Sequence, residues 1–160
     1  MKSFIESLSQ HSADALARHK QHFPSGAELS LQVLKGHLLV EELVREIVNS
    51  RLPHNQALRG DSGASFDCHQ MICLAQAITP QQDLLPWVWP AAKRLNNIRN
   101  KLAHQLDFNA MAQRVDALVT YCIEQQPDIE QDRVELGIPE SARFETCVMA
   151  LSTALVSFRA

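Results

Sequence analysis

The apolar residues of this chain recur mainly at intervals of three and four positions, the spacing that places them on one face of a helix. The run Ile72, Ala75 and Ile78 is typical of this spacing. No segment sustains the alternation of apolar and polar residues that marks a half-buried strand. Glycine and proline are few and cluster between the periodic segments, where they interrupt helices. The pattern predicts an all-α fold, a bundle of about five to six helices with antiparallel core helices.

Residues 27–51 are the best candidate for the central helix, because "LSLQVLKGHLLVEELVREIV" is apolar around most of its circumference. The other helices are predicted at about residues 3–22, 66–78, 91–106, 108–126 and 140–159, with loops at 52–65 and 127–139. Asp107 is an acceptable N-cap for the helix at 108–126. A chain of 160 residues is long enough for one core, so we expect a single domain over residues 1–160. Its core would span about 27–126. The last helix would pack on that core or at a dimer interface.

The net charge, the cysteine content and the apolar runs of the sequence exclude several classes of protein. A net charge of −3 and an isoelectric point near 6.1 exclude a generally basic nucleic-acid-binding protein. The four cysteines, at positions 68, 73, 122 and 147, form no C-x-x-C pair, which is typical of reduced thiols in a cytoplasmic protein. The sequence has neither an apolar signal-peptide core nor eighteen consecutive apolar residues. We therefore expect a cytoplasmic location and no membrane partner.

One stretch departs from the acidic balance of the chain. Residues 84–106 contain no acid and four bases, namely Lys93, Arg94, Arg99 and Lys101. The compensating acids gather in residues 124–135. A local positive field of this kind attracts phosphate groups even when the net charge of the protein is negative.

The apolar residues of the same stretch indicate which face of the helix each polar residue occupies. The helical stripe consists of Ala91, Leu95, Ile98, Leu102 and Leu106. At about 100° per residue, Asn97, Asn100 and His104 fall on the opposite side, where we expect exposure to solvent. Arg99 falls at the edge of the stripe, so we expect its side chain to be half-buried.

Arg99 and His104 are the candidate chemical groups of this helix. Their separation of five positions corresponds to roughly 7.5 Å along the axis and about 140° around it. One copy of the helix cannot easily bring both side chains to a single atom. Two copies related by a two-fold axis would place both sets around one cleft. If the stretch is a functional site, its spacing therefore predicts a homodimer.

The segment Arg99-Asn100-Lys101-Leu102-Ala103-His104 resembles the R-x4-6-H motif of HEPN domains, in which a polar residue follows the arginine. The wider phrase "LNNIRNKLAH" is similar to the sequence around that motif in family members. The order and spacing of "GHLLVEELVREI", "FDCHQMICLAQAI" and the motif helix also resemble the mannitol operon repressor group, which looks like a HEPN relative. The resemblance covers about residues 30–125, and only the motif is specific.

The resemblance implies a helical, usually dimeric domain of prokaryotic defence and toxin systems. Its active members are metal-independent endoribonucleases that need no cofactor. In that chemistry His104 would transfer protons, Arg99 would hold the phosphorane-like transition state, and Asn100 would orient the histidine or the phosphate. Further contacts to RNA would come from Lys93, Arg94, Asn97 and Lys101. The implied partners are RNA, a second copy of the chain, and a cognate antitoxin or regulatory protein.

Alternative interpretations remain open for these residues and for the function. Arg99 could serve structure alone, by neutralising a carboxylate of the central helix. The candidate carboxylates, which could also support Arg99 from behind a site, are those of Glu41, Glu42 and Glu46. His104 could interact with the carbonyl end of its helix. The protein could be a non-catalytic regulatory module like the mannitol operon repressor group, or could bind nucleotides without cleaving them.

Two other groups of residues are predicted to be structural. Cys68, His69 and Cys73 match no common zinc-ligand spacing, so we expect buried cysteines in a helical core and no metal site. Trp87 and Trp89 stand between two prolines. They could stack on bases, but an anchor for the loop or a dimer contact is the simpler interpretation.

Overall fold

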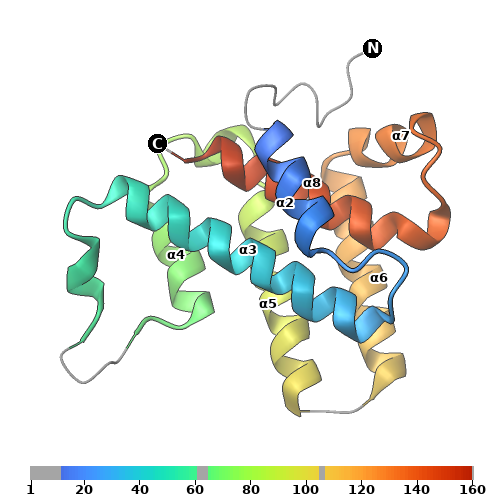
Figure 1. Ribbon diagram of the computed structural model, residues 1–160, viewed down its shortest axis with the longest axis horizontal. Coiled ribbons are helices and arrows are strands. Elements are labelled where there is room, and N and C mark those ends of the chain that lie inside the picture. The colour runs from blue at the N-terminus through green and yellow to red at the C-terminus, as the bar shows by residue number, and fades with distance from the viewer. Residues whose placement is uncertain (1–11, 61–64, 105–106, 160) are drawn as a thin grey trace.

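The fold is organised around one long helix, α3 (Leu29–Arg51), in a computed structural model that describes residues 12–60, 65–104 and 107–159. The described chain is an all-α bundle, as predicted (Figure 1). Its other α-helices are α2 (Ser12–His22), α4 (Cys68–Ile78), α5 (Val88–His104), α6 (Phe108–Gln125), α7 (Asp128–Glu135) and α8 (Arg143–Ser157). Short 3-10 turns, η2 (Asn55–Leu58), η3 (Gln82–Leu84) and η4 (Glu140–Ala142), lie in the connections. Residues 3–11 of the first predicted helix lie outside the described residues.

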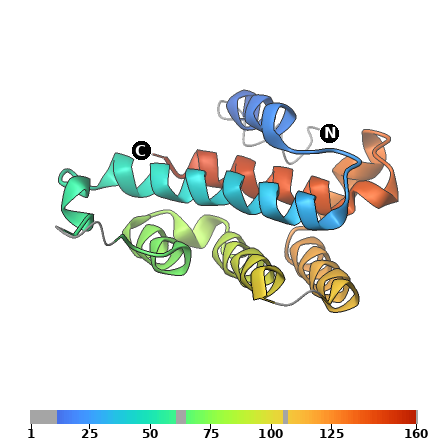
Figure 2. The ribbon, with the colours of Figure 1, turned by 60° about the horizontal axis from the view of Figure 1, so that its bottom comes forward.

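The helices form three layers (Figure 2). α3 and α8 lie side by side in the middle, with α2 on one face and α4, α5 and α6 on the other. α8 buries eleven of its fifteen residues, so the last helix packs on the core of its own chain. Gly36 permits the close contact between the central helices, since a Cβ there would lie 3.3 Å from a methyl carbon of Val148.

The central helices run parallel, whereas the sequence pattern led us to expect antiparallel core helices. Gly36 faces Val148, and further along both helices Arg51 donates to the carbonyl oxygen of Phe158 at 2.6 Å. α5 has the expected antiparallel direction relative to α3. Its first turn stacks Trp89 on Phe158, near the end of α3, and its later residue Asn96 reaches His37. The segment after α6 returns the chain to the beginning of α3, which makes the parallel pairing possible.

Residues 127–139, predicted to form a loop, contain the short helix α7. α7 follows Pro127, and its first turn carries Asp128 and Glu130, which suit the positive end of a helix. Arg133 donates to Glu130 and to the carbonyl oxygen of Ile138. Gly137, with φ of 67°, follows the end of the helix in a conformation that favours glycine. These local interactions stabilise a helix of low apolar content.

Side-chain caps set the beginnings of two helices near the candidate site. Asp107 accepts from the amide of Ala110 and caps α6, as predicted. Asp67 accepts from the amide of Gln70, and the Gln70 side chain accepts from the amide of Asp67, so α4 begins with a capping box. Trp87 and Trp89 are both buried, so neither is available for base stacking. No helix in the described ranges is long and apolar enough to cross a membrane.

Candidate functional site

The motif residues lie at the end of α5 where the helix extends beyond the core. Burial along α5 ends at Ile98, and Arg99, Asn100 and His104 are all exposed. Exposure of Asn100 and His104 was predicted, but the half-buried position expected for Arg99 is wrong. Arg99 does lie on the side of α5 that packs against α3. Ile98, directly before it, is the last buried residue of α5, and the side chain of Arg99 is exposed to solvent.

The guanidinium of Arg99 has a polar partner but no acidic one in the described chain. Its Nη1 donates to Oδ1 of Asn100 at 3.2 Å. Among residues 12–60, 65–104 and 107–159, no carboxylate oxygen lies within 4.0 Å of this guanidinium. Within the part of the chain that the structure describes, no direct ion pair neutralises the positive charge of Arg99.

The three glutamates considered as partners of Arg99 have other positions. Glu46 accepts from Arg18 at 2.5 Å and from Arg159 at 2.7 Å, tying α3 to α2 and to the end of the chain. Glu42 is exposed. Glu41 accepts from Arg45 at 2.8 Å, one turn along the same helix. Because these acids point in different directions around α3, only Glu41 lies on the side that faces α4 and α5.

The other predicted RNA-contacting residues also lie on α5, three of them before the motif and Lys101 within it. Nζ of Lys93 donates to Gln76 of α4 at 2.8 Å, and Arg94 lies 4.3 Å over the ring of Tyr121 on α6. Asn97 is exposed and Lys101 is half-buried. Lys93 and Arg94 thus contact α4 and α6, the two helices that flank α5 in the same layer (Figure 2).

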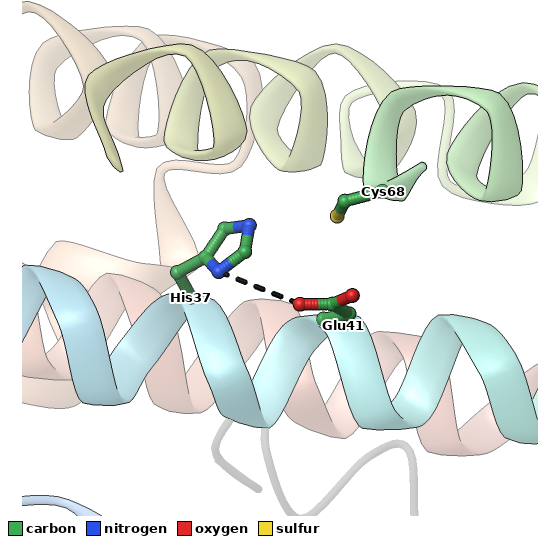
Figure 3. Close-up of side chains that lie close together, drawn as sticks. All are labelled: His37, Glu41 and Cys68. Atoms are coloured by element: carbon green, nitrogen blue, oxygen red, sulfur yellow. Dashed lines mark ion pairs between the residues drawn. The ribbon is translucent and has the colours of Figure 1, made fainter. Parts of the chain in front are cut away.

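A second cluster of polar side chains lies between α3 and α4 (Figure 3). It consists of His37, Glu41 and Cys68, whose nearest ligand atoms all lie within 4.8 Å of one another. Nδ1 of His37 is 3.8 Å from Oε2 of Glu41. On the other side of its ring, Nε2 of His37 lies 2.9 Å from Oδ1 of Asn96, a buried residue of α5. The cluster therefore joins three helices at one point.

The pKa values of His37 and Cys68 are shifted because both side chains are partly buried. Burial lowers the pKa of His37 below its ordinary value, against the opposing effects of Asn96 and Glu41, so the neutral imidazole is favoured. Burial, and then the negative charge of Glu41, raise the pKa of Cys68 to about 11. The positive charge of Arg99 contributes, less strongly, to lowering both values, which places Arg99 close to this cluster.

Sequence reasoning missed His37 and Asn96 and treated Cys68 as part of a different group. His69, its neighbour in the sequence, is exposed and lies 3.6 Å from Cys73 instead. The available signal was the i, i+4 spacing of His37 and Glu41, which places both side chains on one face of the predicted central helix. Their convergence with Cys68 depends on how α4 packs on α3, which no local pattern reveals.

An apolar stripe is exposed on the first half of α3. Leu31, Leu34 and Leu38 are 42%, 39% and 49% exposed, and their spacing places them on one face. His37, which contacts α5, lies between two of them in the sequence. The stripe therefore borders the contact between α3 and the motif helix. Exposed leucines at helical spacing are a common feature of surfaces that bind another protein chain.

A cavity away from these residues lies between α2 and α8. Its volume is about 590 Å³, and its wall includes His19, Ser25 and Glu145 but none of the motif residues. Nε2 of His19 lies 3.1 Å from Oε1 of Glu145, which also accepts from Ser25 at 2.5 Å. This polar group thus occupies the opposite face of the central layer from α5 (Figure 2).

Comparisons of this chain with models of protein families, with curated proteins and with solved structures found no match.

Proposed function

We propose that this protein is a HEPN-type, metal-independent endoribonuclease that acts as a homodimer in a toxin or defence system. The observation that carries the proposal is the exposed group of Arg99, Asn100 and His104, in which the arginine has no carboxylate partner within 4.0 Å in the described chain. A guanidinium held next to an amide and open to solvent suits a phosphate group. Residues 84–106 contain four bases and no acid, so the charge of this segment is positive and attracts phosphate groups.

The proposed reaction uses the 2′-hydroxyl of RNA as the nucleophile. His104 accepts the proton of that hydroxyl as its oxygen attacks phosphorus, and a proton is returned to the 5′-oxygen as the phosphorus–oxygen bond to it breaks. The product ends in a 2′,3′-cyclic phosphate. Arg99 stabilises the negative charge that develops on the phosphoryl oxygens, and Asn100 orients the Arg99 guanidinium through their hydrogen bond.

A second copy of the chain is needed to bring Arg99 and His104 side chains together around one phosphate group. Arg99 and His104 of one helix point to different sides, so the partner copy completes the cleft. The exposed leucines of α3 supply an apolar surface for that contact beside the motif helix. RNA bound across the cleft would also contact Lys93, Arg94, Asn97 and Lys101.

RNA cleavage by the full chain in the presence of a chelator tests the catalytic proposal. We expect fragments ending in cyclic phosphate, and a rate at least about 100-fold lower for His104→Ala, the scale of lost acid–base catalysis. His22→Ala is the matched control, because His22 is also an exposed histidine at the last position of a helix. Identical RNA profiles from the wild type and His104→Ala would contradict the proposal.

Sedimentation of the double variant Leu34→Glu/Leu38→Glu tests the dimer. We expect a monomer without cleavage activity, because charges on the apolar stripe oppose association. Leu136→Glu changes another exposed leucine, next to α7, and should remain dimeric and active. A wild-type monomer that cleaves RNA would contradict the requirement for a second copy.

The exposed leucine stripe also favours a second candidate, a non-catalytic module that binds a regulatory protein or antitoxin through α3. In that case the wild type leaves RNA intact, and the two leucine substitutions remove binding of the partner protein. The same two assays therefore separate the candidates.

A further inference from the structure

The His37–Glu41–Cys68 cluster has the composition and spacing of a metal-binding site. Its three ligand atoms are an imidazole nitrogen, a carboxylate oxygen and a sulfur within 4.8 Å of one another (Figure 3). In a tetrahedral zinc site, bond lengths of about 2.0–2.3 Å place neighbouring ligand atoms roughly 3.3–3.6 Å apart. The 3.8 Å between Nδ1 of His37 and Oε2 of Glu41 is close to that separation and too long for a hydrogen bond.

The hydrogen bond to Asn96 fixes which nitrogen of His37 is available. Oδ1 of Asn96 is a carbonyl oxygen and only accepts, so Nε2 of His37 carries the proton and donates to it at 2.9 Å. Nδ1 then keeps its lone pair, which faces the Glu41 carboxylate. Without a cation between them, two electron-rich atoms face each other in a partly buried place. A second hydrogen bond of this kind is a common feature of histidines that bind metals.

Glu41 and Cys68 are also held in place by neighbouring groups. Oε1 of Glu41 accepts from Arg45 at 2.8 Å, which leaves Oε2 directed at the cluster. Cys68 is the first residue of α4, whose beginning is set by the Asp67–Gln70 capping box. A neighbouring group outside the ligand set therefore positions each ligand, as expected of a preorganised metal site.

We propose that His37, Glu41 and Cys68 bind one divalent transition-metal ion, with Zn²⁺ as the best fit. Mixed nitrogen, oxygen and thiolate ligands suit Zn²⁺, whereas Mg²⁺ and Ca²⁺ prefer oxygen ligands alone. The Cys68 thiol loses its proton to solvent when the ion binds. A neutral imidazole, a carboxylate and a thiolate then carry two negative charges, which the ion neutralises. Three protein ligands leave a fourth position for water or an external ligand.

The ion would join α3 to the first turn of α4, close to Arg99. The site goes beyond the proposed ribonuclease, whose chemistry uses no metal. Its role is to hold α3 and the first turn of α4 together near Arg99. Ion binding and RNA cleavage are separate properties, since one is measured without RNA and the other in a chelator.

Cobalt substitution tests the site directly. The full chain is stripped with a chelator under reducing conditions and titrated with Co²⁺ alone. We expect one Co²⁺ per chain with a thiolate-to-cobalt charge-transfer band, and displacement of Co²⁺ by Zn²⁺. Cys68→Ser should abolish the band and weaken Zn²⁺ binding at least about 100-fold.

Cys73→Ser is the matched control, because Cys73 is a half-buried cysteine of the same helix and lies next to His69, outside the cluster. It should keep the band and the affinity. Asn96→Ala should keep the band but bind Zn²⁺ at least about tenfold more weakly, as expected when a group that orients a ligand is removed. Far-UV circular dichroism establishes that each variant is folded.

Three results would overturn the proposal. The first is a wild type without the charge-transfer band. The second is a band that persists unchanged in folded Cys68→Ser. The third is a band lost in Cys73→Ser, which would assign the ion to the surface pair His69 and Cys73. His104→Ala should bind Co²⁺ as the wild type does, so a failed ribonuclease assay leaves this result unaffected.

Discussion

Two buried histidines, each near a glutamate, occupy opposite faces of the central helix layer and differ in how their ring nitrogens are used. His19 is 5% exposed, stacks on Phe23 and bonds directly to Glu145 at 3.1 Å. Its Nδ1 is buried and has no hydrogen-bond partner in the described chain. His37 instead donates to the amide of Asn96 and directs its second nitrogen at Glu41, 3.8 Å away, with Cys68 nearby.

The difference shows why proximity of a histidine and a carboxylate does not by itself identify a ligand site. In the first pair the Glu145 carboxylate accepts hydrogen bonds from His19 and from the Ser25 hydroxyl, so direct hydrogen bonds hold the histidine and the carboxylate together. In the second pair, His37 donates its proton to the amide oxygen of Asn96, and one carboxylate oxygen of Glu41 accepts from Arg45. The lone pairs of His37 Nδ1 and Glu41 Oε2 are then directed at one another. The arrangement of partners separates a structural hydrogen bond from a proposed cation site.

The largest expected effect is stabilisation by Zn²⁺ through one histidine and not the other. At a free ion concentration about 100 times the dissociation constant, binding raises the free energy of unfolding by about 2.7 kcal/mol. For 160 residues this is roughly 5 to 10 °C in Tm. Differential scanning fluorimetry should show the shift in the wild type and in His19→Ala, and none in His37→Ala. A shift retained in His37→Ala would remove the distinction between the pairs.

The next effect compares the two carboxylates in the absence of metal. Glu145→Ala should cost about 1–3 kcal/mol, because it leaves the buried Nε2 of His19 without an acceptor. Glu41→Ala should cost about 0.5 kcal/mol or less, since Glu41 accepts only from Arg45 on its own helix while His37 keeps its bond to Asn96. Urea unfolding in a chelator measures both values. Equal losses would mean that the Glu41 carboxylate supports the metal-free fold as strongly as Glu145 does.

The smallest effect is shared by both histidines and appears in the pH dependence of stability. Burial lowers the folded pKa of His19 and of His37 below the ordinary 6.5, despite the opposing effect of their partners. Below pH 6.5 the unfolded chain therefore binds more protons, and stability present at pH 7.5 is lost towards pH 5.5. Each histidine contributes at most about 1.4 kcal/mol per pH unit.

Urea unfolding at pH 7.5 and 5.5, in a chelator, measures this dependence. His19→Gln and His37→Gln should each reduce it, because glutamine donates a hydrogen bond without titrating. If both variants lose stability with acid as steeply as the wild type, the two histidines are not the groups responsible.

Most of the helices follow from local patterns, and the exceptions have identifiable causes. The spacing of apolar residues predicted α3, α4, α5, α6 and α8, and Asp107 was recognised as a cap. α7 was missed because its stability comes from charges at its ends and from Arg133 bonding back to the loop, not from an apolar face. The parallel direction of α3 and α8 depends on the path of the chain after α6, which the spacing of residues does not contain.

The candidate sites divide in the same way. The wheel of α5 placed Asn100 and His104 on the outside because rotation by about 100° per residue is a property of the helix alone. The exposure of Arg99 was mispredicted because it depends on where neighbouring helices stop covering α5. Ion pairs around Glu46 and the positions of Glu41 and Glu42 depend likewise on which helix faces which side of α3.

The sequence by itself determined an all-α chain, the limits of most of its helices, and a basic helix whose motif residues resemble the HEPN pattern, because these properties depend on neighbours a few positions apart. Only the tertiary structure decided that His37, Glu41 and Cys68 meet, and that Asn96 fixes the proton of His37. The physical reason is separation along the chain. Cys68 is 27 positions after Glu41, and Asn96 is 59 after His37, so their contacts exist only because α4 and α5 pack on α3.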